Sequence, residues 1–147
     1  TRGAALGSAS RLTSDKPPPA GPLKSVHTAG LPDLLKQLGV SLLVTTYQAG
    51  KLFVVRADGD KLNTHFRNFP MPMGLALARG RLALGTKNQV WEFVNQPEVS
   101  AKLDPPGKHD ACYLPRRTHY TGDIRIHEIG YAGDELWAVN TRFSCLC

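Results

Sequence analysis

The sequence has no long apolar segment and few cysteines. No run of residues approaches the roughly 18–20 consecutive apolar side chains that a membrane-spanning helix needs, and no apolar stretch of signal-peptide length follows Arg2. Three cysteines are too few for a disulfide-framed secreted module. We therefore interpret them as thiols in the reducing environment of the cytoplasm, and expect no membrane span.

Several functional motifs are also absent. The chain contains no G-x-G-x-x-G, no P-loop, no G-x-S-x-G and no N-x-S/T sequence, so nothing supports a nucleotide cofactor, a serine hydrolase or N-glycosylation. The formal charge is +6, but residues 1–40 carry five basic and two acidic side chains and account for half of it. Because no RNA- or DNA-binding motif accompanies this charge, nucleic acid is not an expected partner. The cofactor stays unknown.

The composition changes along the 147 residues. Hydrophobic residues make up 41% and charged residues 20%, which is typical of a globular protein. Residues 1–30 are rich in Ala, Gly, Ser and Pro and predict a flexible lead-in. Pro32 and Gly39 bracket a short predicted helix over 31–38. The chain starts at Thr1 and stops within a strand-like stretch, so we expect a fragment of a longer protein.

After residue 40 the pattern is that of antiparallel strands. Short β-branched or alternating stretches are separated by turn pairs such as Asp58-Gly59, Arg79-Gly80 and Gly133-Asp134. The predicted strands cover 41–46, 51–56, 61–67, 74–78, 81–86, 89–94, 123–129 and 135–140.

Three segments resemble one another and predict the fold. They start at Leu42, Leu82 and Leu136, with offsets of 40 and 54 residues, and each has an apolar strand ending in Thr, a short polar break and a second apolar strand. A period of about 40–50 residues in an all-strand sequence is typical of β-propeller blades. We assign the longer offset to a Pro-rich loop over 95–120. The prediction is an all-β, incomplete β-propeller of about two to three blades over 31–147. A β-sandwich is the alternative.

Six motifs in order, over about residues 38–147, resemble a known group of proteins. They read SLLVTTYQAGKL, PMGLAL, RLALGTKNQVWEF, HDACYLPRR, TGDIRIHE and LWAVNTRFSCL. The chain resembles an uncharacterised, mostly bacterial family of β-propeller-like conserved hypothetical proteins. The resemblance implies further strands beyond Cys147 and brings no established activity.

The densest polar segment, residues 108–128, contains the first candidate site. If 123–129 is a strand, Asp123, Arg125 and His127 share one face, and Ile124 and Ile126 point into the sheet packing. In a catalytic site His127 would act as the base and Asp123 would orient it. Because these two residues would be about 13 Å apart along a straight strand, a shared metal needs a bend or bulge, and metal ligands stay unknown. The alternative role for these groups is an ordinary turn and sheet edge.

Basic and aromatic side chains nearby suggest an anion site. The guanidinium of an arginine can bind a phosphate, sulfate or carboxylate group through two parallel hydrogen bonds. A solvated loop whose arginines pair with acids is the alternative. Asn140 and Arg142 could face the same site, whereas the repeated Thr at strand ends is expected to tie neighbouring strands through its hydroxyl. The candidate ligand-binding residues are Lys108, His109, Arg116, Arg117, His119, Arg125, Asn140 and Arg142.

Two functions follow from the sequence. The first is a propeller-type domain that binds a small anionic ligand or a protein partner; the alternative is a metal-assisted propeller hydrolase of the lactonase type. Whether the protein is an enzyme stays open. Trp91 and Trp137 are expected to be packing residues, and Cys145 and Cys147 to be buried thiols.

Overall fold

The computed structural model describes residues 26–147. The predicted lead-in over 1–30 therefore lies almost wholly outside the described residues. The elements, in chain order, are α1 (Leu31–Leu38), β1 (Leu42–Thr46), β2 (Lys51–Asp58), β3 (Lys61–Asn68), β4 (Leu75–Ala78), β5 (Arg81–Gly85), β6 (Gln89–Asn95), α2 (Pro97–Ser100), β7 (Tyr113–Tyr120), β8 (Ile126–Ala132), β9 (Glu135–Asn140) and β10 (Cys145–Leu146).

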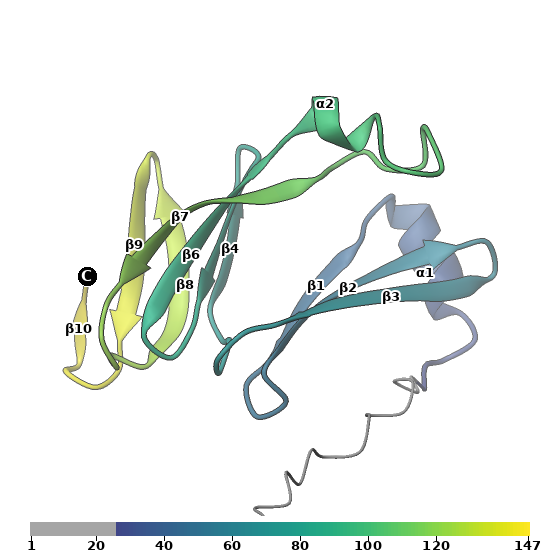
Figure 1. Cartoon of the computed structure of the whole chain (residues 1–147). Coiled ribbons are helices and arrows are strands. Elements are labelled where there is room, and N and C mark those ends of the chain that lie inside the picture. Colours follow the sequence, from purple (N-terminus) through teal and green to yellow (C-terminus); the bar gives the residue numbers. More distant parts are fainter. Residues whose placement is uncertain (1–25) are drawn as a thin grey trace, which may run out of the picture.

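The strands form three antiparallel sheets, each from consecutive stretches of the chain. The orders are β1-β2-β3, β4-β5-β6-β7 and β10-β9-β8. Figure 1 shows the four-stranded sheet lying between the other two. The prediction of a mostly β chain with one short helix first is thus confirmed, and the bounds of α1 agree with the sequence pattern.

The four-stranded sheet has a core on each face. On one face Leu82, Leu84 and Phe93 pack with Leu52 of the first sheet. On the other face Ala76, Ala83 and Val90 pack with side chains of the third sheet, which include Ile126, Ile129 and Ala138. Successive residues of β5 therefore contribute to different cores, as the strand's alternation requires. Helix α1 packs against β2 and β3 and buries Leu35.

Two element predictions need correction. The segment 95–120, expected as a loop, contains α2 and the eight residues of β7. Strand β7 contains Pro115, which pairs with Phe93. The strand accommodates this proline because β7 lies at the sheet edge and the pairing shifts register between Glu92 and Phe93. The strand expected over 123–129 begins only at Ile126 and runs to Ala132.

Several side chains are more exposed than the sequence predicts. Cys145 and Cys147 are exposed free thiols, and Trp137 is 43% exposed, so these three are not buried packing residues. Trp91 does pack, against Phe69 and Phe93. Trp137, Cys145 and Cys147 lie in the strands of the third sheet or directly after them. No other described sheet packs against the outer face of the third sheet.

Candidate functional site

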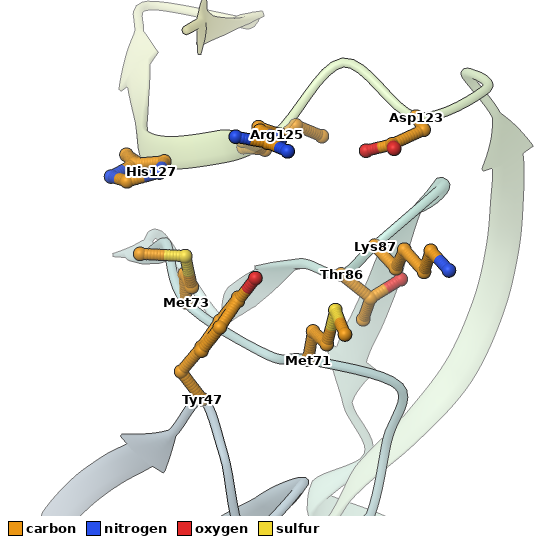
Figure 2. Close-up of a pocket in the computed structure, with 9 residues that line it drawn as sticks. Tyr47, Met71, Met73, Thr86, Lys87, Asp123, Arg125 and His127 are labelled. Carbon is orange, nitrogen blue, oxygen red and sulfur yellow. The ribbon is translucent and has the colours of Figure 1, made fainter. Parts of the chain in front are cut away.

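A cleft opens where the connections between strands meet at one end of the sheets. Its volume is about 190 Å³. Figure 2 shows Tyr47, Met71 and Met73 on one wall, facing His127, Arg125 and Asp123 across the gap. The lining residues are Tyr47, Met71, Met73, Thr86, Lys87, Asp123, Arg125, Ile126 and His127.

Four connections supply these residues. Tyr47 lies in the β1–β2 turn and Thr86 and Lys87 in the β5–β6 turn. Met71 and Met73 come from the β3–β4 connection, and the polar wall comes from the β7–β8 connection and the start of β8. The cleft is therefore assembled from all three sheets, although no two of these segments are adjacent in the sequence.

Backbone hydrogen bonds fix the methionine wall. The Met73 N–H donates to the Gly85 carbonyl at 3.0 Å, and the Lys87 N–H donates to the Pro70 carbonyl at 2.9 Å. The Thr45 hydroxyl donates to the Met73 carbonyl at 2.7 Å, which attaches the first sheet to the same connection. These bonds hold the segment between β3 and β4 against the neighbouring turns.

The polar wall is attached to the third sheet. Arg142 Nη1 donates to Asp123 Oδ2 at 2.8 Å and to the Asp123 carbonyl at 3.1 Å. The Thr141 N–H donates to the Arg125 carbonyl at 3.4 Å. Asp123 is thus held by Arg142, and no described contact joins it to His127.

Two non-glycine residues of the cleft have left-handed backbones. Arg125 has a φ of 52° and Met71 a φ of 46°. This conformation costs a non-glycine residue roughly 1–2 kcal/mol, and such residues concentrate at functional sites. The backbone hydrogen bonds of the two connections offset this cost and keep Arg125 and Met71 in opposite walls.

The cleft carries excess positive charge. Among residues 26–147, neither Lys87 nor Arg125 forms an ion pair, while the carboxylate of Asp123 is already paired with Arg142. His127 adds a further ring nitrogen donor and a further charge when protonated. The arrangement can therefore bind an anion through a guanidinium and an imidazole, with an ammonium group at the rim.

The structure brings together some of the predicted site residues. Asp123, Arg125 and His127 line the cleft, but Asp123 and Arg125 precede β8, so they do not share one strand face as predicted. Of the positions expected behind them, Ile126 is buried and Ile124 packs against the same core. Arg142 joins the site through Asp123.

Lys108 and His109 lie elsewhere. Lys108 Nζ donates to Asp58 Oδ1 at 2.8 Å, and His109 Nδ1 is 3.4 Å from Arg56 Nη1. Both partners are near the end of β2 remote from Tyr47. The hydrogen bond and charge of Lys108 lower the pKa of Asp58 below its usual value. These residues form a surface contact between the chain after α2 and the first sheet.

The remaining candidates are also outside the cleft. His119 pairs with Glu92 at 2.6 Å, and Arg116 and Arg117 are exposed on the edge strand β7. Asn140 is 6% exposed, and its Oδ1 accepts from the Phe143 N–H at 3.1 Å, so it caps the β9–β10 turn.

The predicted role of the repeated threonines is confirmed at two of the turns. The Thr86 hydroxyl donates to the Gln89 carbonyl at 2.9 Å, and the Thr46 hydroxyl lies 3.2 Å from both the N–H and the carbonyl of Lys51. Each bond joins the two strands that flank the turn.

Sequence reasoning missed Tyr47, Met71, Met73 and Lys87. A usable signal was present, because Tyr47, Lys87 and Arg142 follow equivalent strands of the similar segments. Equivalent turns in stacked sheets lie at the same end, so this offset alone could have placed the three side chains near one another.

The described residues contain neither a metal-ligand cluster nor a helix that could span a membrane. No group of three or more His, Cys, Asp or Glu side chains in residues 26–147 is arranged to hold a metal ion. Within the same range, neither helix has the length and apolar character required to cross a bilayer.

The fold and the cleft define a mostly β protein with a polar site at the strand connections. Residues 29–147 match the model of a family described as a domain of unknown function, DUF4915, and the chain belongs to that family. Comparison with curated proteins and with solved structures gave no match.

Proposed function

We propose that residues 31–147 belong to a β-propeller-type domain that binds a small anionic ligand in the cleft between Tyr47 and Arg125.

The order and stacking of the sheets support the architecture. Propeller blades are four-stranded antiparallel sheets arranged side by side. Here β4-β5-β6-β7 is such a sheet in chain order, with another sheet packed on each face. The similar segments beginning at Leu42, Leu82 and Leu136 fall on β1, β5 and β9, and each of these strands pairs with the strand that follows it in the chain.

The outer faces give further support. On the first sheet Leu42 and Val44 are 41% and 42% exposed, and they pair across β1 and β2 with Val55 and Phe53. On the third sheet Leu146 is 66% exposed beside Val139. Apolar faces of this kind suit a sheet that has neighbours on both sides, as a propeller blade has.

One observation carries the binding proposal: Lys87 and Arg125 lack ion-pair partners among the described residues, while the acid of the same cleft is engaged by Arg142. A cationic side chain that is already paired with an acid of the protein contributes little to ligand binding. Lys87 and Arg125 have no such pair among the described residues and can therefore bind an anion. The loops that hold them come from the scaffold's strand ends, where binding residues are commonly placed.

The test is a titration of the protein with inorganic phosphate and with acetate, followed by NMR. Arg125→Gln should weaken binding at least about tenfold, because a hydrogen bond to a charged group contributes about 1.5–3 kcal/mol. Lys87→Gln should weaken it less. Lys102→Gln removes one exposed positive charge outside the cleft and should change nothing. Failure of both anions to bind, or equal effects of all three variants, would overturn the proposal.

The metal-assisted hydrolase has less support. Asp123 and His127 are the metal-ligand types that line the cleft, and the Asp123 carboxylate is paired with Arg142. The protein-partner alternative has no observation that favours it over a small anion.

We also propose a cytoplasmic location. All three cysteines are free, and Cys145 and Cys147 are exposed. Exposed thiols persist in a reducing compartment.

A further inference from the structure

The two walls of the cleft differ in chemistry, and the geometry points to a small organic carboxylate with an apolar body as the ligand class. This inference rests on the proposed anion site and deepens it. Figure 2 shows an aromatic ring and two thioethers on one wall and Asp123, Arg125 and His127 on the other, while Lys87 lies beside Thr86 at the edge of the first wall. A ligand that spans the gap therefore meets apolar groups on one side and cations on the other.

The apolar wall is made of side chains that the cores do not use. Tyr47 is 45% exposed and Met71 is 40% exposed, and neither belongs to a core cluster. Methionine adapts to irregular apolar shapes, and tyrosine combines an apolar ring with a hydroxyl. A ligand that covered these side chains would remove their apolar surface from water, which a bare inorganic oxyanion cannot do favourably.

The polar wall, formed by Asp123, Arg125 and His127, fits a carboxylate. The planar guanidinium of Arg125 can donate two parallel hydrogen bonds to one carboxylate group. In Figure 2 it lies between His127 and Asp123, while the ammonium group of Lys87 points away from His127 at the side of the cleft. Arg125 is therefore the group positioned to hold the carboxylate, and Lys87 adds charge at the rim.

The size of the cleft limits the ligand. Its volume of about 190 Å³ is below the range of about 300–1,000 Å³ that is usual for drug-sized molecules. A single ring or a short aliphatic chain with one carboxylate suits this volume better than a nucleotide. The apolar part would lie on Met71 and Met73, with the Tyr47 hydroxyl available as an additional donor.

The experiment compares four probes on the whole chain: sodium benzoate, sodium acetate, inorganic phosphate and neutral benzamide. Benzoate should bind about tenfold more tightly than acetate, because the ring buries apolar area that a methyl group does not. Benzamide should bind at least about tenfold more weakly than benzoate, because it lacks the charge that Arg125 pairs with.

Two variants test the apolar wall. Met71→Gln should reduce the benzoate affinity toward that of acetate and leave phosphate and acetate unchanged. Leu77→Gln makes the same type of change at a 60% exposed position outside the cleft and should have no effect on any probe. Because both side chains are exposed, neither variant is expected to unfold the protein.

The outcomes separate the two proposals. Equal affinities for benzoate and acetate, or a benzoate affinity unaffected by Met71→Gln, would overturn the ligand class while the anion site stands. Absence of binding by benzoate, acetate and phosphate together would overturn the anion site itself, and the ligand class with it.

Discussion

Gly85 and Ile126 are in such close contact that a Cβ atom added to Gly85 would lie 2.6 Å from Ile126 Cγ2. Gly85 ends β5 in the four-stranded sheet, and Ile126 begins β8 in the third. The absence of a side chain at Gly85 thus allows the third sheet to approach the four-stranded sheet closely at the cleft.

Gly85→Ala should therefore destabilise the protein by about 1–3 kcal/mol, as overpacking of a tight core does. Urea unfolding would measure the loss. Gly130→Ala, at a position with nothing within 4 Å of the added Cβ, is the control. The cost should be smaller in an Ile126→Ala background, since that change removes the nearest obstructing atom, Cγ2; an unchanged cost would disprove the contact.

The Asp123–Arg142 ion pair should act on ligand affinity more than on stability. Both side chains are substantially exposed, so the pair contributes about 0–1 kcal/mol to folding. Arg142→Gln leaves the Asp123 carboxylate uncompensated beside the cleft and should weaken benzoate binding several-fold at low salt. Adding Asp123→Asn should restore the affinity. If the double variant binds as weakly as Arg142→Gln, charge compensation is not the role of the pair.

Arg125→Gly should separate stability from binding. Glycine relieves a left-handed conformation that costs roughly 1–2 kcal/mol but adds about 0.5–1 kcal/mol of backbone entropy to the unfolded chain. The free energy of unfolding should rise by up to about 1.5 kcal/mol, while anion binding is lost. Arg79→Gly, at a φ of 49°, is the matched control and should gain stability with binding intact. A large loss of stability in Arg125→Gly would mean that the guanidinium has a structural role.

Lys108 should determine the titration of Asp58. Because Lys108 lowers the pKa of this carboxyl in the folded protein, the pair favours folding above the usual carboxyl pKa, and this contribution disappears as the pH falls through the lowered value. In Lys108→Gln, NMR titration should show the pKa of Asp58 returning toward its ordinary value. Lys102→Gln should leave it lowered. The same low pKa in both variants would show that another group is responsible.

Much of the fold could be predicted because its signals are local. The helix over 31–38 has its Pro and Gly at the right places, and the turns at Asp58-Gly59, Arg79-Gly80 and Gly133-Asp134 all join consecutive strands. The strand β7 was missed because its residues are polar and include Pro115, which only an edge position with a register shift tolerates.

The site was less predictable because its geometry is tertiary. Alternation along a strand placed Asp123 and Arg125 on one face with His127, but the strand starts after them and bonds to the third sheet set their backbone. The opposite wall came from Met71 and Met73, whose sequence pattern indicates only packing. The distribution of charges was visible in the sequence, but the pairing of Asp123 with Arg142 was not.

β5 has neither a solvent-facing side nor an unpaired edge. It pairs with β4 and β6, and Leu82 through Gly85 are buried. Exchange of these amide hydrogens with deuterated water requires separation of sheets as well as strands, so they should be the last among residues 26–147 to exchange. Their protection would then report the opening free energy of the whole stack, against which faster-exchanging segments such as the β9–β10 turn can be compared.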